Sequence, residues 1–176
     1  PPVENNSSVS EILAVADGMG GQKAGEVASS LSIKLLEDQF SQCLAGKKPI
    51  DCEPGDFLKH AIAKVNSEVH KMAALEEYQG MGTTLVVSAI NSGKATIANV
   101  GDSRCYLYRN GCLQSITKDH SLVRFMIESG AITEEEAKTH PQRNVITRAI
   151  GLEEHVEIDI FSIDLLPGDR SEEHTS

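Results

Sequence analysis

The stretch ILAVADGMGG at residues 12–21 decides the fold, because an apolar run ends there in a carboxylate and a glycine-rich turn. Residues 12–16 have the composition of a buried β-strand. At the end of such a strand, Asp17 would be held rigidly with both carboxylate oxygens available. The next residue, Gly18, has no side chain to keep its own carbonyl away from an ion. The stretch therefore predicts a metal site that uses Asp17 and Gly18.

A different ligand can occupy the same local structure. A strand, a glycine-rich turn and a helix also open dinucleotide-binding units, where the helix N-terminus binds a pyrophosphate. The glycine fingerprint of those units fails here, because its third position is Lys23. Asp17 would also place a negative charge against the phosphate, so the nucleotide interpretation is disfavoured.

Helical and strand periodicities follow one another along the rest of the chain. Two long helices are predicted at residues 24–44 and 56–77. Their apolar stripes are Ala24, Val27, Ala28, Leu31, Leu35 and Phe40 in the first, and Leu58, Ile62, Val65, Val69 and Met72 in the second. An antiparallel meander is predicted at residues 83–90, 94–100, 105–108 and 113–117, with turns at 91–93 and 110–111.

The last part of the chain first becomes helical again and then returns to strand. A helical excursion is predicted at residues 121–143, with a capping box formed by Thr133 and Glu136. Residues 144–151 and 156–166 are predicted to be strands. Two consecutive long helices between one strand and a series of hairpins indicate an α+β fold rather than alternating βαβ units.

Three later motifs follow in an informative order: GMGTT at 80–84, ANVGDSR at 98–104 and TKDHS at 117–121. Together with VADGMGG at 15–21 and GEVAS at 25–29, they resemble the metal-dependent serine/threonine protein phosphatases of the PPM (type 2C) family, in its bacterial form. The resemblance covers residues 12–169. It implies an antiparallel β-sandwich flanked by helical pairs, in four α-β-β-α layers, here incomplete.

The resemblance also implies a reaction. Members of this family hydrolyse phosphoserine and phosphothreonine on proteins with a water activated by two Mg²⁺ or Mn²⁺ ions, and a third ion is held more weakly. Asp17 matches the bridging, catalytic carboxylate, Gly18 supplies a carbonyl to one ion, and Asp102 matches a ligand of the third. An aspartate placed like Asp102 can instead cap a turn. The expected partners are phosphorylated proteins and a cognate bacterial serine/threonine kinase.

Other polar residues of these motifs are expected to be structural. Thr83 and Thr84 open a strand beside a glycine, where hydroxyl groups usually bond locally. Arg104 is expected to pair with a buried carboxylate rather than to contact phosphate. By resemblance, the Asp119-His120 pair fixes the loop that leads to the flap, residues 121–143, rather than acting as an acid and base.

Both ends of the chain depart from the family. Residues 1–10 lack the phosphate-binding arginine and the Asn-Glu-Asp segment of its members, and no Ser-Asp-Gly or Asp-Asn metal-ligand segment follows residues 165–169. Residues 170–176, RSEEHTS, resemble the translation of a DNA-sequencing adapter. We therefore expect residues 1–169 to be a partial, truncated phosphatase domain that is weakly active or inactive, followed by a non-native tail. The alternative is a non-catalytic sensor or binding module with the same fold.

Composition sets the remaining limits. The 176 residues are 40% hydrophobic, which suffices for one core. No apolar run approaches a membrane span and no signal peptide is visible, so this chain is expected to be cytoplasmic, or the cytoplasmic part of something larger, and to contain no membrane span. A net charge of -10 argues against nucleic acid as a partner. The four cysteines, Cys43, Cys52, Cys105 and Cys112, lack zinc-site spacing and are expected to be reduced thiols.

Overall fold

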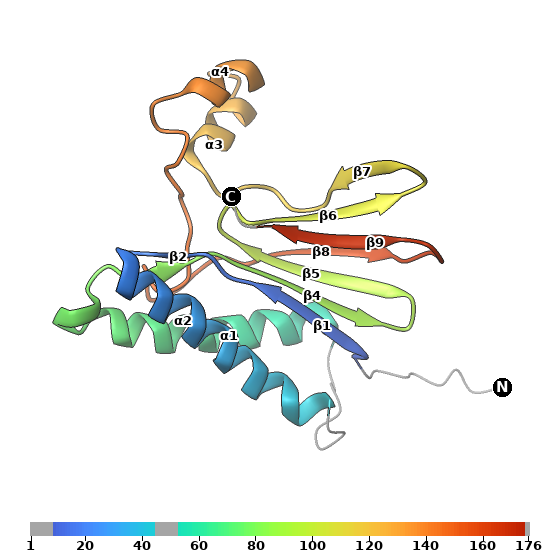
Figure 1. Cartoon of the computed structure of the whole chain (residues 1–176), viewed down its shortest axis with the longest axis horizontal. Helices are drawn as coiled ribbons and strands as arrows, with labels where there is room; N and C mark the ends of the chain where they lie inside the picture. The colour runs from blue at the N-terminus through green and yellow to red at the C-terminus, as the bar shows by residue number, and fades with distance from the viewer. Residues whose placement is uncertain (1–8, 45–52, 175–176) are drawn as a thin grey trace.

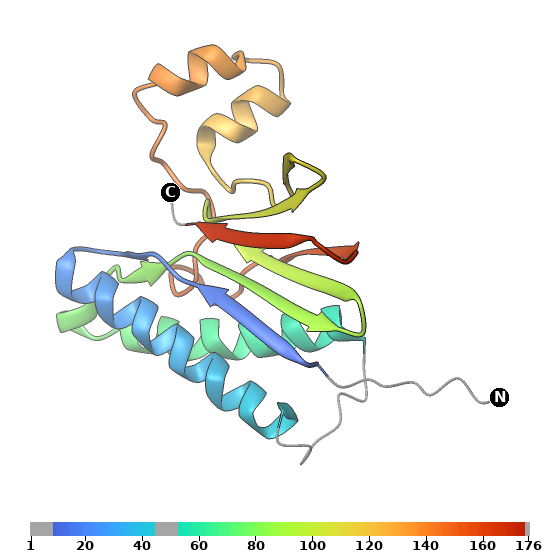
Figure 2. The ribbon, with the colours of Figure 1, turned by 45° about the vertical axis from the view of Figure 1, so that its right-hand side comes forward.

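The computed structural model describes residues 9–44 and 53–174. These residues form three layers: two long helices, a four-stranded sheet and a three-stranded sheet (Figures 1 and 2). A pair of short helices stands away from the layers. The predicted α+β class with antiparallel sheets is confirmed. The second helical layer implied by the resemblance is not formed by the described residues.

The four-stranded sheet is antiparallel throughout and has the order β1-β4-β5-β8. Its strands are β1 (Glu11–Val15), β4 (Leu85–Asn91), β5 (Lys94–Val100) and β8 (Asp159–Asp164). Because β1 lies at the edge, its residues are exposed or half-buried, and the prediction of a buried strand before Asp17 is wrong. The central strands β4 and β5 are the buried ones.

The helices α1 (Gln22–Leu44) and α2 (Pro54–Ala73) pack on one face of this sheet. The predicted stripe of α2 is confirmed, with Leu58, Ile62, Val65 and Val69 all buried. On α1 the stripe lies differently: Ala28, Ser32, Leu36 and Phe40 are buried, whereas Leu31 and Leu35 are half-buried. The polar Ser32 is fully buried on this face, so the apolar pattern alone placed the contact face slightly wrong.

The second sheet has the order β7-β6-β9. Its strands are β6 (Arg104–Arg109), β7 (Cys112–Ser115) and β9 (Arg170–His174). The chain leaves the first sheet after β5 and enters the second at β6, so the predicted meander is divided between two sheets. The assignment of residues 170–176 to a non-native tail stays a prediction, and residues 175–176 lie outside the described part.

The two cysteines of the β6–β7 hairpin are free thiols, as expected. Arg109 pairs with Cys112 across the turn, so Cys105 does not face Cys112. Cys105 is buried between the sheets, and this burial, with the nearby carboxylate of Glu173, raises the pKa of its thiol to about 11. Cys52 lies outside the described residues, as does the side chain of Cys43.

Two elements predicted from the sequence differ in the structure. One helix ends earlier than predicted, and one predicted strand is not formed. The second long helix stops at Ala73 and is followed by a short 3-10 turn, η1 (Glu76–Tyr78), so the predicted end at residue 77 is wrong. Residues 144–151 form no strand. They make only isolated bridges, to Ser121 through Ile146 and to Thr83 through Ile150. A segment that pairs with two different neighbours, one after the other, cannot form a continuous strand ladder with either of them.

None of the described helices is long and apolar enough to cross a bilayer.

The flap is helical, as predicted, and consists of α3 (Leu122–Glu128) and α4 (Glu134–Thr139). Ser121 caps α3 by accepting a hydrogen bond from the backbone of Arg124. The capping box of Thr133 and Glu136 is present at α4. These local caps begin each short helix at the position that the sequence predicted.

The glycine-rich turn after Asp17 is pressed against the helical layer. β2 (Gly18–Met19) pairs with β3 (Gly82–Thr83), and its first residue touches the start of α1. A Cβ on Gly18 would lie 1.9 Å from the carbonyl oxygen of Gly25. Gly18 is therefore required by packing, whether or not its carbonyl binds an ion.

We expect Gly18→Ala to destabilise the fold, because backbone atoms of α1 cannot yield as a side chain would. The loss in free energy of unfolding should reach at least the upper end of the about 1–3 kcal/mol typical of overpacking. The matched control is Gly55→Ala, whose Cβ would meet the Cγ2 methyl of Ile160 at 3.2 Å, a side-chain contact that needs a shift of only a few tenths of an ångström. It should change stability by at most about 1 kcal/mol. Urea unfolding of both variants measures the difference, and equal losses would contradict this account.

An ion pair fastens the turn before β9 to the end of β6. The Arg109 guanidinium donates to both carboxylate oxygens of Asp169 at 2.9 and 2.7 Å, and the Leu166 amide donates to one of them at 2.7 Å. These bonds, led by Arg109, lower the pKa of Asp169 to about 2. The stabilisation is therefore complete above about pH 4 and is lost as the pH falls towards 2.

We expect Asp169→Asn to lower the urea midpoint at pH 6, because the amide loses the charged bonds to Arg109. The difference between the wild type and this variant should shrink as the pH is lowered from about 4 towards 2, since the wild-type carboxyl then becomes protonated. Urea titrations at several pH values measure it. A difference that stays constant over this range would show that the carboxylate charge contributes nothing.

Candidate active site

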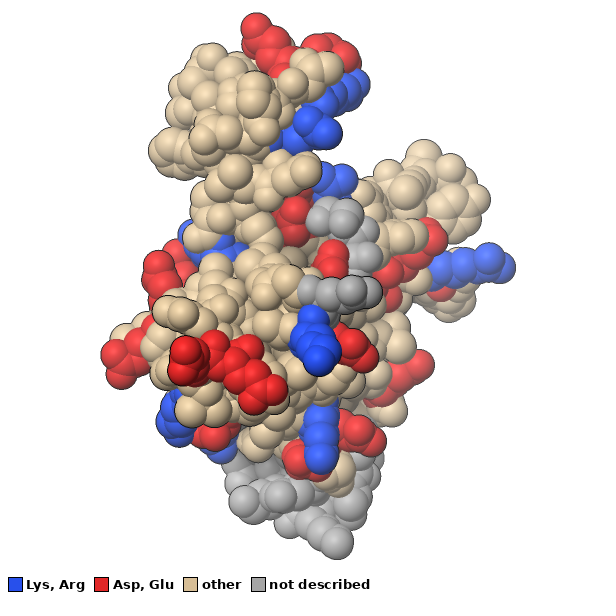
Figure 3. All heavy atoms as spheres, turned by 60° about the vertical axis from the view of Figure 1, so that its left-hand side comes forward, with Lys and Arg blue, Asp and Glu red and all other residues tan. Residues whose placement is uncertain are grey.

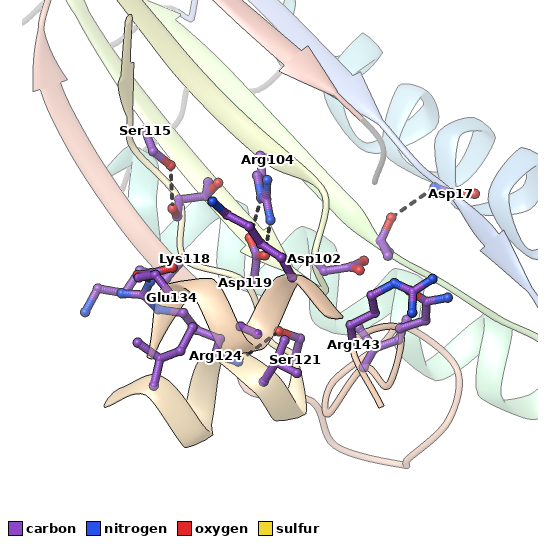
Figure 4. A pocket seen from close by; sticks show the side chains of 18 of the residues that line it. Asp17, Asp102, Arg104, Ser115, Lys118, Asp119, Ser121, Arg124, Glu134 and Arg143 are labelled. Atoms are coloured by element: carbon purple, nitrogen blue, oxygen red, sulfur yellow. Dashed lines mark hydrogen bonds and ion pairs between the residues drawn. The ribbon is translucent and has the colours of Figure 1, made fainter. Parts of the chain in front are cut away.

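A cleft of about 1040 Å³ lies between the strand ends and the flap (Figure 4). All three residues predicted to form the metal site, Asp17, Gly18 and Asp102, line it. Asp17 and Asp102 are half-buried and Gly18 is exposed. Two turns that are 85 positions apart in the sequence thus present their carboxylates to one space.

The backbone of Asp17 is held on both sides by two threonines. Its amide donates to the hydroxyl of Thr84 at 3.0 Å, which is the dashed line beside Asp17 in Figure 4. Its carbonyl accepts from the Thr83 hydroxyl and from the Thr84 amide, both at 2.9 Å. Both threonines are buried. The expectation that they are structural is confirmed, and their role is to fix the residue that carries the candidate carboxylate.

The same Thr84 connects to the second turn. Its hydroxyl lies 2.6 Å from that of Ser103, which is fully buried beside Asp102. Gly101, with φ +108°, approaches so closely that a Cβ there would lie 2.7 Å from the Cβ of Thr84. One residue, Thr84, therefore contacts both the turn that carries Asp17 and the turn that carries Asp102.

Arg104 pairs with a largely buried carboxylate, as predicted. It donates to both oxygens of Asp119, at 2.8 and 2.5 Å, and the Asp119 side chain is 17% exposed. This two-bond geometry fixes the guanidinium plane. Arg104 lines the cleft but is occupied, which leaves it poorly suited to bind phosphate.

His120 is buried and serves the loop rather than the cleft, in line with the prediction for the Asp119-His120 pair. Its backbone amide donates to the Gly101 carbonyl at 3.0 Å, and its Nδ1 accepts from the Gly101 amide at 3.1 Å. His120 does not line the cleft.

Most cations of the cleft already have partners. Lys118 faces Glu128 at 3.7 Å, Arg124 contacts Glu128 and Glu134, and Lys138 contacts Glu135. Figure 3 shows basic side chains gathered where the flap faces the sheets and acidic ones at its outer end.

Arg143 differs from these cations. Among the described residues that line the cleft, it is the one cation whose side chain makes no hydrogen bond or ion pair. It is exposed and lies in the turn that leaves the flap (Figure 4). Sequence reasoning missed this residue, since nothing in its neighbourhood distinguishes an unpaired arginine from a paired one.

The described donors fit a divalent cation in kind and fall short in number. Two carboxylates and a carbonyl are the hard oxygen ligands that Mg²⁺ and Mn²⁺ prefer, and Mg²⁺ is often held by one or two carboxylates with water and phosphate completing the shell. No group of three or more Asp, Glu, His or Cys side chains within residues 9–44 and 53–174 could hold a metal. Asp17, Gly18 and Asp102 would therefore supply some of the ligands of a metal centre, but too few to hold two ions.

Residues 2–124 match the family model described as protein phosphatase 2C. The chain belongs to this family. The serine/threonine phosphatase stp of Listeria monocytogenes is 40% identical over 168 residues, which are 95% of this chain and 66% of that protein. The family assignment agrees with the order of the motifs around Asp17, Asp102 and His120.

Solved structures of protein phosphatase 2C relatives share the fold. Serine/threonine phosphatase Stp1 from Staphylococcus aureus gives a TM-score of 0.79 at 40% identity, covering 88% of this chain and 60% of that one. The catalytic domain of the phosphatase PstP, solved in complex with two manganese ions, gives 0.76 at 35% identity, covering 97% of this chain and 71% of that one. The chain spans less than two thirds of the length of the Listeria and Staphylococcus relatives.

We expect Thr84→Val to loosen Asp17, because the valine cannot accept the Asp17 amide and leaves Ser103 without its partner. The free energy of unfolding should fall by about 1–3 kcal/mol, as for other buried groups left unpaired. Amide exchange at Asp17 should accelerate. Thr84→Ser is the matched control, since it keeps the hydroxyl and should preserve slow exchange. Fast exchange in both variants, or slow exchange in both, would contradict the role of the hydroxyl.

Proposed function

We propose that this protein acts, as part of a longer chain, as a metal-dependent phosphatase of phosphoserine and phosphothreonine on proteins. One observation carries the proposal: Asp17 and Asp102 line a single cleft that also holds the unpaired cation Arg143. Carboxylates can hold a divalent cation, and an arginine can bind a phosphate through two parallel hydrogen bonds. The protein phosphatase 2C relatives, which are named serine/threonine phosphatases, support the same substrate class.

Each residue has a distinct part in this reaction. Asp17 and the Gly18 carbonyl would hold Mg²⁺ or Mn²⁺, with Asp102 at a further, weaker ion. A bound divalent ion lowers the pKa of a coordinated water and offsets phosphate charge. Because Thr83 and Thr84 bind its backbone at both ends, Asp17 would keep its orientation as charge develops on the phosphate. Arg143 would orient the phosphoryl group from the flap side.

A second candidate is a non-catalytic module of the same fold that binds phosphoproteins. The observation in its favour is the small set of metal ligands in the described part of the chain. Under either candidate the partners are phosphorylated proteins in the cytoplasm, including targets of a cognate serine/threonine kinase.

Hydrolysis of a phosphothreonine peptide with Mn²⁺ tests the proposal. The assay compares this 176-residue chain with the complete reading frame at its source locus, each with and without Asp17→Asn. We expect the complete protein to be active and the 176-residue chain to be slow or silent. Loss of an outer-shell partner costs about 10–100-fold at metal sites, so loss of Asp17 itself should cost at least ~100-fold. Asp38→Asn, on an exposed position of α1, is the control and should leave activity unchanged.

The possible results separate the candidates. Full activity of the 176-residue chain would mean that the ligand set described above is incomplete. Activity that survives Asp17→Asn would remove Asp17 from the metal site. Binding of the phosphopeptide without hydrolysis under Mg²⁺ and Mn²⁺, in the complete protein, would favour the binding module.

A further inference from the structure

His120 connects the Asp102 turn to the segment that returns from the flap. It is 7% exposed, and it bonds the amide and the carbonyl of one residue, Gly101, with its ring and its backbone. The carbonyl of His120 in turn accepts the amide of Thr147, at 2.8 Å, in the returning segment. One buried residue thus contacts the chain immediately before Asp102 and the chain immediately after the flap.

The far side of the imidazole faces an ion pair. Its Nε2 lies 3.3 Å from a carboxylate oxygen of Asp159, at the start of β8. The other oxygen of Asp159 accepts from Arg148 at 3.0 Å, and Arg148 also contacts Glu157 at 2.7 Å. Arg148 belongs to the returning segment, so the flap is joined to His120 by a side-chain contact as well as by the backbone.

The hydrogen bonds determine the tautomer of the neutral ring. The Gly101 amide can only donate, so Nδ1 must accept and the ring proton must be on Nε2. A proton on Nε2 is on the side of the ring that faces Asp159, whose carboxylate oxygen lies 3.3 Å from Nε2 and can only accept when ionised. Arg148 lies 3.3 Å from Nε2 but is a donor too, so its bond goes to Asp159 instead. Each ring nitrogen therefore has one partner and a separate task.

We propose that His120 is a positioning residue that fixes Asp102 through Gly101 and couples that turn to the flap through Asp159 and Arg148. Gly101 has φ +108°, a conformation with few intrinsic restraints in glycine, so bonds to both of its backbone groups are what hold it. The consequence for metal binding rests on the proposed function of Asp102. The coupling itself rests on the hydrogen bonds of His120 to Gly101 and Thr147 and on its ion-pair contact with Asp159.

Two substitutions separate the two sides of the ring. In His120→Asn, the side-chain oxygen is as many bonds from the backbone as Nδ1 and can still accept the Gly101 amide. In His120→Gln, the longer side chain can donate to Asp159 from near the position of Nε2 but offers Gly101 no acceptor at the Nδ1 position. The pair therefore compares loss of the flap connection with loss of the Gly101 bond.

Amide exchange by NMR on the metal-free 176-residue chain is the first measurement. We expect exchange at Gly101 to accelerate at least ~10-fold in His120→Gln, the loss expected when a hydrogen bond of about 1.4 kcal/mol is removed, and to stay near the wild-type rate in His120→Asn. The ¹⁵N shifts of the wild-type ring should report the Nε2–H tautomer. Equal exchange in the two variants would overturn the proposal. So would an Nδ1–H tautomer in the wild type, which remains decisive if a variant fails to fold.

Mn²⁺ titration of the same chains tests the link to the site. His120→Gln should weaken the binding that depends on Asp102 several-fold, whereas His120→Asn should not. Asp102→Asn is the reference variant. If it leaves Mn²⁺ binding unchanged, the metal role of Asp102 in the proposed function is wrong, and the exchange at Gly101 still decides whether His120 positions the turn.

Discussion

The attachment of the Asp17 backbone to Thr83 and Thr84 is the constraint on which the rest of the site depends. Three hydrogen bonds of 2.9–3.0 Å join a turn at the edge of the sheet to the strand that follows the helical layer. Their groups are buried or half-buried, so each would be costly to leave unpaired. The bonds also explain why the predicted strand at residues 83–90 is interrupted. Thr84 belongs to neither β3 nor β4, because its backbone amide donates to the Asp17 carbonyl instead of to a neighbouring strand.

Close backbone approach follows from this attachment. Bringing β2 under the start of α1 requires Gly18 and Gly25 to meet without side chains, and bringing the Asp102 turn to Thr84 requires Gly101 to lack one. Gly18, Gly25 and Gly101 are thus steric requirements of two turns that share one threonine. A Gly18 carbonyl directed at an ion is compatible with this requirement but is not needed to explain it.

Sequence reasoning succeeded where a local pattern has one structural outcome. The Arg109–Cys112 pairing follows from a two-residue turn, the α4 capping box from a four-residue motif, and the α2 stripe from simple periodicity. It failed at residues 144–151, whose apolar and β-branched composition indicates a strand. There the choice is made by partners distant in sequence, Ser121 and Thr83, which no local pattern specifies.

The residues of the candidate site also fall into two groups, those that the sequence predicted and those that only the folded structure reveals. Asp17 and Gly18 were predicted from a strand that ends in a carboxylate and a glycine-rich turn, and Asp102 from its place in a motif of a known family. One contribution depended on the assembled chain. Asn66, buried on α2, bonds the backbone of Gly151, Glu153 and Glu154 and so holds the segment that leaves the flap, yet in sequence it only interrupts an apolar stripe.

The cleft has two walls that are stabilised in different ways. The wall with the carboxylates is fixed by buried hydrogen bonds, whereas the flap, whose helices bury only Ala137, relies on exposed ion pairs such as those of Arg124, each worth about 0–1 kcal/mol. Local opening should therefore begin in the flap helices α3 and α4 and not in the wall that carries Asp17 and Asp102.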